Sequence, residues 1–160
     1  DPLYVYRREL VTTWELRDRI EIGGEPFLQP IRVRGPEDVL PYLRPWAGLA
    51  EEHLVVVALD NRMRITGHAV VSVGTAASTP ASGRSVARAA VMSGAAAIIV
   101  AHNHPSGEVE PSPDDIEATR RLAAACTAVE VPLLDHIIVG VDPQGGACRY
   151  ASLKSKGVLP

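Results

Sequence analysis

Three short apolar runs constrain the fold of this chain more than any other feature of its sequence. Residues 54–59, 95–101 and 133–141 are each rich in Val, Ile, Leu or Ala. Runs of this length and composition predict strands that are covered on both faces. Segments with helical patterns alternate with these runs, so the chain is expected to be an α/β domain with helices packed on a sheet.

The remaining elements are predicted from spacing and from helix-ending residues. Helices are expected from Pro36 to near Gly48, over residues 84–93 and over residues 113–129. Further strands are expected at residues 65–73 and after the turn Gly145-Gly146. Hairpin-like pieces early in the chain predict a mixed sheet rather than a purely parallel one.

The first part of the chain has a different character. Residues 1–35 have the composition of extended pieces, with a turn signal at Gly23-Gly24. We therefore predict an N-terminal β-rich extension over residues 1–48, made of strands and one short helix, and a main domain over residues 49–160. A length of 160 residues suits a single hydrophobic core.

Composition excludes several classes of protein. The net charge of −3 offers no dominant basic field for phosphate backbones, which leaves nucleic-acid binding uncertain. Two cysteines are too few for a disulfide framework, and Cys126 falls on the apolar stripe of a predicted helix. No apolar run is long enough to cross a membrane, so we expect a protein of the reducing cytoplasm without a membrane partner.

Two histidines at the end of the second apolar run are the first candidates for chemistry. Side chains alternate along a strand, so His102 and His104 leave it on the same side, and Asn103 points away. A pair of imidazoles in this position suits a divalent metal of the zinc type. A bare HxH pattern is weak by itself, and more support is needed from other residues.

Asp115 supplies that support. It stands at the third position of a helix whose N-cap is Ser112, so the simplest interpretation is a helix cap. At about 100° per residue, however, Asp115 lies on the same arc as Thr119, Leu122 and Cys126, which is the buried side. A carboxylate turned toward the core is costly unless its charge is compensated, and a metal would do so. Its neighbour Asp114 points toward the exposed side.

A hydrolytic metal site also needs a general base. Three protein ligands leave one tetrahedral position for water, which is the pattern of a catalytic zinc site. Glu51 and Glu52 precede the strand at residues 54–59. The strand pattern alone does not choose between them, and solvated charges before a strand are the simplest interpretation of both.

The candidates fall into one known signature. Glu52, then His102-Asn103-His104, seven residues, Ser112, two residues and Asp115 match the JAMM motif of JAB/MPN+ metalloproteases. The surrounding residues, about 50–153, resemble the RadC-like branch of that family. The matching segments include the apolar run that leads into His-Asn-His-Pro-Ser-Gly and the segment Leu-Asp-His-Ile-Ile-Val-Gly from residue 134.

This resemblance implies a cytidine-deaminase-like α/β fold and a Zn²⁺ ion bound by His102, His104 and Asp115. It further implies that Glu52 is the base for the attacking water, and that Ser112 hydrogen-bonds this water or the oxyanion. The implied substrate is a peptide or an isopeptide-linked protein, with partners in DNA repair or in mobile elements as a further possibility. Residues 1–48 do not resemble the helical DNA-binding-like segment of longer RadC proteins.

Three other functions are less favoured than a zinc peptidase. A metal-dependent nuclease of DNA metabolism is not favoured by a single His-His-Asp site in an acidic chain. A non-catalytic scaffold is the least favoured, because scaffold members of the fold typically lose ligands, and this chain keeps them. A zinc nucleobase deaminase is disfavoured because the sequence lacks the HxE and PCxxC motifs of such sites.

Three further histidines have weaker patterns. His136 lies within an apolar run, where a core or hydrogen-bonded role is favoured over catalysis. His68 is expected in a strand with no obvious partner. His53 is adjacent to Glu52, and the sequence assigns it no role.

Overall fold

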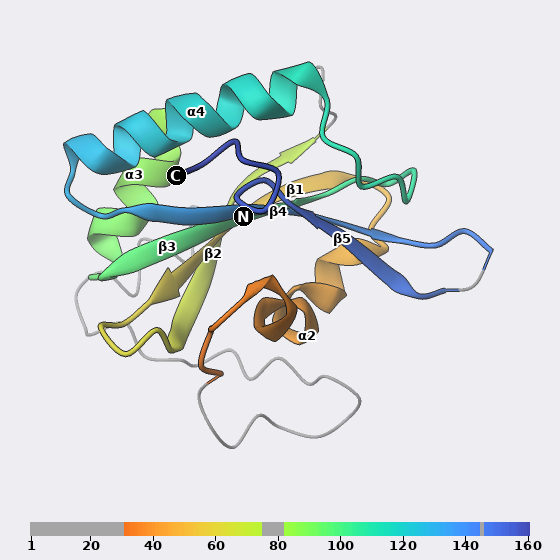
Figure 1. The fold of residues 1–160 in the computed structure, drawn as a ribbon, viewed down its shortest axis with the longest axis horizontal. Coiled ribbons are helices and arrows are strands. Elements are labelled where there is room, and N and C mark those ends of the chain that lie inside the picture. Colours follow the sequence, from red (N-terminus) through yellow and green to blue (C-terminus); the bar gives the residue numbers. More distant parts are fainter. Residues whose placement is uncertain (1–30, 75–81, 145) are drawn as a thin grey trace.

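The computed structural model describes residues 31–74, 82–144 and 146–160, and these residues form the α/β domain that the apolar runs predict (Figure 1). Each of the three apolar runs is a strand. Within the described residues, none of the helices combines the length and apolarity that a membrane crossing requires. The elements follow in the order α2 (Pro36–Ala47), β1 (Glu52–Leu59), β2 (Ile65–Gly74), α3 (Gly83–Met92), β3 (Ala97–Asn103), α4 (Pro113–Ala128), β4 (Leu133–Val141) and β5 (Cys148–Ser152).

The five strands form one mixed sheet in the order β2-β1-β3-β4-β5. Strands β3 and β4 are parallel and are connected through α4, whereas the other neighbouring pairs are antiparallel. The prediction of a mixed sheet is therefore confirmed. Because β1 runs opposite to β3, the start of β1 lies at the same end of the sheet as the ends of β3 and β4.

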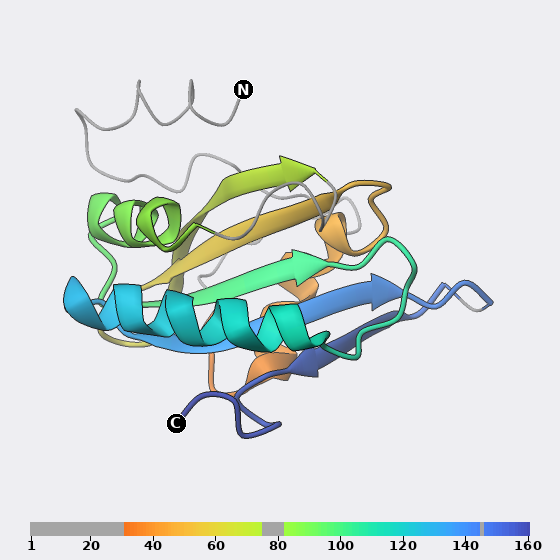
Figure 2. The same ribbon diagram turned by 90° about the horizontal axis from the view of Figure 1, so that it is seen from above.

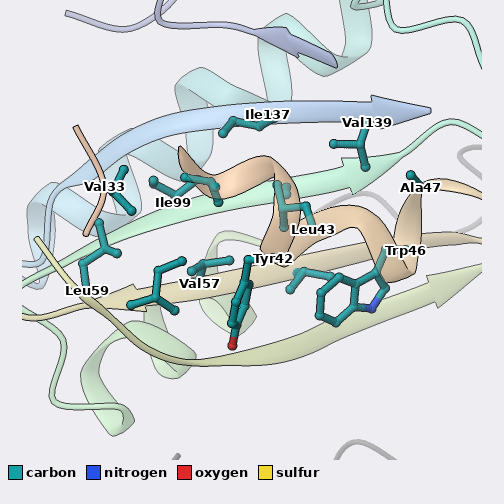
Figure 3. Packing of buried hydrophobic residues seen from close by; sticks show 14 residues of the cluster. Val33, Tyr42, Leu43, Trp46, Ala47, Val57, Leu59, Ile99, Ile137 and Val139 are labelled. Carbon is teal, nitrogen blue, oxygen red and sulfur yellow. The ribbon is translucent and has the colours of Figure 1, made fainter. Parts of the chain in front are cut away.

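Helix α2 covers one face of the sheet, and α3 and α4 cover the other (Figures 1 and 2). Helix α2 begins after Gly35, and the Asp38 carboxylate accepts hydrogen bonds from the backbone N–H groups of Arg34 and Gly35. Its buried side packs Leu43 and Trp46 against alternate residues of the central strands (Figure 3). This face is an apolar layer with an aromatic edge.

The opposite face has a second apolar core. Val56 of β1 and Val100 of β3 pack beneath Ala90 of α3 and Leu122 of α4. Consecutive residues of one strand enter different cores, since Val100 belongs to this layer and Ile99 to the layer beneath α2. Coverage on both faces explains why these strands are nearly continuous in apolar residues.

The N-terminal part of the chain is described only from residue 31. The expected strand at residues 3–13 and the turn at Gly23-Gly24 lie outside the described residues. Helix α2, which was assigned to the extension, packs on the same sheet as the main domain. The division of the chain at residue 48 stays a prediction.

Candidate metal centre

The end of β3 brings two imidazoles together. The Nε2 atoms of His102 and His104 are 2.9 Å apart, and both rings lie on the α4 side of the sheet. Asn103 points to the opposite side and is fully buried. Strand alternation therefore produces the arrangement that the sequence predicts.

The first turn of α4 brings Asp115 to this pair. Its Oδ1 lies 3.3 Å from Nε2 of His102, and its Oδ2 lies 3.6 Å from Nε2 of His104. Asp115 also completes a capping box, in which its Oδ2 accepts hydrogen bonds from the backbone N–H and the hydroxyl of Ser112. The cap and the ligand interpretations are thus compatible, because capping fixes the carboxylate that faces the histidines.

The pKa of Asp115 has two opposing causes. Burial favours the neutral acid, but hydrogen bonds with His102, His104 and Ser112 outweigh it and hold the pKa well below its usual range. The pKa of His104 is raised, chiefly by its hydrogen bond to Asp115 and against the effect of burial. The site therefore combines one carboxylate with two imidazoles in a half-buried position.

The separations between these atoms suit a small metal ion. A tetrahedral zinc ion with ligands at about 2.0–2.1 Å keeps neighbouring ligand atoms about 3.3 Å apart. The three separations here, 2.9, 3.3 and 3.6 Å, surround that value. Of the described residues, this trio of His102, His104 and Asp115 is the group of His, Cys, Asp or Glu that could hold a metal.

His104 is oriented by the loop that follows it. Its backbone N–H donates to the carbonyl of Val139 on β4, and its Nδ1 lies 2.7 Å from the carbonyl oxygen of Glu108. A carbonyl can only accept, so Nδ1 carries a proton, and in the neutral ring Nε2 keeps its lone pair toward the site. Gly107, with φ +82°, closes this loop by contacting the backbone of β4.

His102 is oriented from inside the protein instead. Its Nδ1 lies 2.7 Å from Nε2 of His136, a neighbour on β4 that is 2% exposed. The other ring nitrogen of His136 lies 2.6 Å from the hydroxyl of Thr119 on α4. Burial lowers the pKa of His136 well below its usual value. The expectation of a hydrogen-bonded core histidine agrees with these contacts.

Strand pairing places Glu52 near the histidines and distinguishes it from Glu51. In the antiparallel ladder Leu54 pairs with His102, so Glu52, two residues earlier, projects on the same face as His102 and His104. The charge of Glu52 contributes to the raised pKa of His104. Asn103 holds this end of β1, because its amide accepts from the N–H of His53 and donates to the carbonyl of Glu51.

The sequence matches a family model over most of this region. The model describes a RadC-like JAB domain, and it matches residues 33–158. This chain belongs to the RadC-like JAB domain family. The five-stranded sheet with three helices is the JAB fold of this domain, and its HxH strand and capped α4 carry the JAMM signature.

Three UPF0758 relatives of this chain are longer than the chain itself. A UPF0758 protein of Trichormus variabilis is 50% identical over 90 residues, which are 56% of this chain and 37% of the relative. A UPF0758 protein of Rubrobacter xylanophilus is 38% identical over 151 residues, 94% of this chain and 63% of the relative. One of Desulfitobacterium hafniense is 33% identical over 151 residues, 91% and 63% of the two chains. This chain thus spans less than two thirds of these relatives.

Ser112 of the JAB domain is exposed and hydrogen-bonds Asp115. Its hydroxyl donates to Oδ2 of Asp115 over 2.7 Å and accepts the backbone N–H of Asp115 over 3.1 Å. Its expected contact with water or an oxyanion stays a prediction. Asp114 is exposed, as predicted. On the same exposed side of α4, Glu117 and Arg121 form an ion pair at 3.2 Å.

Two further histidines of the JAB domain are not among the candidate metal ligands. His68 does have a partner, contrary to expectation: its Nδ1 lies 2.8 Å from the hydroxyl of Tyr42 on α2. Its ring also meets Trp46 edge-on at 4.9 Å. His53 donates its backbone N–H to Asn103, and its ring contacts the carbonyl of Glu51.

The hydrogen-bond partners of three residues around the JAB metal centre were not predicted from the sequence: those of Asn103, Thr119 and His136, although His136 was expected to have a core or hydrogen-bonded role. A signal existed for Asn103, because a buried amide between two strand residues requires hydrogen-bond partners. The contacts of His136 depend on the pairing of β3 with β4, where Val100 faces His136.

Proposed function

We propose that this chain is a zinc-dependent hydrolase that cleaves peptide or isopeptide bonds. The observation that carries the proposal is the convergence of two imidazole nitrogens and one carboxylate within 3.6 Å of one another, with Glu52 on the same face of the sheet. Three protein ligands are typical of catalytic rather than structural zinc sites. The family of metallohydrolases that share this signature supports the same conclusion.

In this proposal His102 and His104 bind the metal through Nε2, and Asp115 binds it through its carboxylate. Zinc bound there would supply a Lewis acid that polarises a substrate carbonyl and lowers the pKa of a water molecule. The Nδ1 atom of each histidine is hydrogen-bonded, that of His102 to His136 and that of His104 to the Glu108 carbonyl. These bonds hold the two Nε2 atoms in place for the metal.

Glu52 takes the role of the general base. Its carboxylate accepts the proton of the attacking water and then passes it to the amine that leaves. The start of β1 is a rigid position for this task, because Asn103 pins the backbone on both sides of Glu52, at Glu51 and at His53.

Ser112 has two tasks in this mechanism. Its hydroxyl orients the Asp115 carboxylate, as the 2.7 Å contact indicates. Ser112 is exposed, and by rotating, its hydroxyl can donate to the carbonyl oxygen of the substrate as negative charge develops there.

The experiment compares Glu52→Gln with Glu51→Gln in zinc-loaded protein. The two glutamates are adjacent, but only the side chain of Glu52 is expected to face the metal ligands. We would digest a peptide library and a set of peptides linked through a lysine side chain, and identify products by mass spectrometry. Glu52→Gln should bind zinc yet lose hydrolysis by at least about 100-fold, whereas Glu51→Gln should resemble wild type.

Other outcomes would contradict this function. Equal hydrolysis by wild type and Glu52→Gln would remove Glu52 from the mechanism. Cleavage of DNA by the zinc-loaded protein, lost in His104→Ala, with no cleavage of either peptide set, would replace the peptidase with a nuclease. Stoichiometric zinc binding without cleavage of any of these substrates would favour a scaffold.

A further inference from the structure

A chain of three hydrogen bonds leads from His102 into the interior of the domain. His102 Nδ1 contacts His136 Nε2 over 2.7 Å, and His136 Nδ1 contacts the Thr119 hydroxyl over 2.6 Å. The hydroxyl in turn contacts the backbone carbonyl oxygen of Asp115 over 2.6 Å. The chain thus starts at one candidate ligand, crosses β4 and ends on the backbone of another.

The carbonyl at the end of the chain fixes the direction of each bond. The carbonyl oxygen of Asp115 cannot donate, so the hydroxyl of Thr119 donates to it. The Thr119 oxygen must then accept from His136, which places a proton on Nδ1 of His136. The ring of His136 is buried, and the partners of its two nitrogens are an imidazole and a hydroxyl, so a charged ring would be costly and its Nε2 is left as an acceptor. His102 therefore carries its proton on Nδ1.

We propose that His136 and Thr119 are positioning residues that fix the tautomer and orientation of His102, leaving its Nε2 lone pair directed at the metal site. This inference rests on the proposed metal centre. His104 reaches the same state by a different route, since a backbone carbonyl, that of Glu108, accepts its Nδ1 proton. The carbonyl of residue 108 is present whatever its side chain is. The orientation of His102, by contrast, requires two particular side chains, those of His136 and Thr119.

These three hydrogen bonds also connect the separate elements that carry the ligands. His102 lies on β3, Asp115 lies on α4, and His136 bridges them from β4. Removing a hydrogen-bond partner of a metal-ligating histidine typically lowers metal affinity by about 10–100-fold. A histidine that merely filled the core would affect stability and leave both the tautomer of His102 and the zinc affinity unchanged.

Two pairs of variants test the proposal. Thr119→Val removes the hydroxyl, and Thr119→Ser keeps it. His136→Leu removes the acceptor, and His136→Gln keeps one near the position of Nε2. The tautomer of His102 would be read by nitrogen NMR of the metal-free chain at alkaline pH, and zinc affinity by competition with a chromogenic chelator. Circular dichroism and thermal unfolding would show that each variant is folded.

We expect wild type and Thr119→Ser to carry the His102 proton on Nδ1, and Thr119→Val to move it toward Nε2. Zinc affinity should fall by about 10–100-fold in His136→Leu and recover in part in His136→Gln. A wild-type His102 protonated on Nε2, or a folded His136→Leu with unchanged zinc affinity, would overturn the proposal. Failure of wild type to bind zinc would instead refute the metal centre, and the NMR measurement would still decide the tautomer.

Discussion

The two faces of the sheet are built from the same strands and do different things. Beneath α2, Ile99 and Ala101 of β3 join an apolar layer, and the next residue on that face is Asn103, whose buried amide hydrogen-bonds the backbone of Glu51 and His53. On the α4 side, Ile98 and Val100 begin an equally apolar layer, but the next residue on that face is His102. The α2 face therefore stabilises the domain and fixes the start of β1, whereas the α4 face stabilises it along most of its length and holds the metal ligands at one end.

The difference between the faces shows where buried polar groups are tolerated in this domain. The site lies where the parallel strands β3 and β4 end, beyond the last apolar contacts of α4, and each of its buried polar groups has a hydrogen-bond partner. Stability and metal binding should consequently be separable by substitution on one face and coupled on the other.

The largest effect is expected from a matched pair of core truncations. Leu43 beneath α2 and Leu122 on α4 are both fully buried, so Leu43→Ala and Leu122→Ala should each cost about 2–5 kcal/mol in the free energy of unfolding. Zinc affinity should stay unchanged in Leu43→Ala and fall in Leu122→Ala, because α4 carries Asp115. Urea unfolding without metal, followed by zinc titration of the folded proteins, measures both. Equal zinc affinities in the two variants would break the comparison of the faces.

A smaller effect is expected at the loop that orients His104. Gly107 has a positive φ, and a Cβ there would collide with the carbonyl oxygen of Val141. Gly107→Ala should therefore cost about 1–3 kcal/mol and weaken zinc binding. Gly94→Ala is the control, since Gly94 has φ +63° but an added Cβ would have nothing within 4 Å. This control should lose about 1–2 kcal/mol of stability with normal zinc affinity. The same zinc affinity in both variants would exclude the loop as a support for His104.

The smallest effect concerns pH. Asp115 raises the pKa of His104 above its ordinary value, so this pair stabilises the metal-free domain most between about pH 4 and pH 6.5, and the contribution is lost as pH rises through the folded pKa of His104. Zinc affinity should change in the opposite direction, rising by up to about tenfold per pH unit until His104 is neutral, because binding releases its proton. Zinc titrations and thermal unfolding across this range measure both trends. A pH-independent zinc affinity would contradict the assignment of His104 as a ligand.

Features set within one element were predictable from the sequence, and features set between elements were not. Alternation along β3 placed His102 with His104, and helical spacing turned Asp115 toward the core, because each depends on a single period. The choice between Glu51 and Glu52 depended on the pairing of β1 with β3. Without the resemblance to the JAMM motif, the sequence left that choice open.

The hydrogen-bond partners of His136 were even harder to predict from the sequence. They depend on the parallel pairing of β3 with β4, which has an irregularity between Ile98 and Ile99, and on the rotation of α4 that presents Thr119. The contact of His68 with Tyr42 depends likewise on how α2 lies across the sheet. Such contacts follow from tertiary packing, which no local pattern encodes.

The most direct test of the account is elemental analysis of zinc per chain, after zinc loading and removal of excess metal. Wild type should retain about one zinc ion, as should the control Asp114→Asn, whose carboxylate is exposed beside the site. Asp115→Asn and His104→Ala should retain none. Absence of zinc in wild type, or its retention in both ligand variants, would contradict the assignment of His102, His104 and Asp115 as a metal centre.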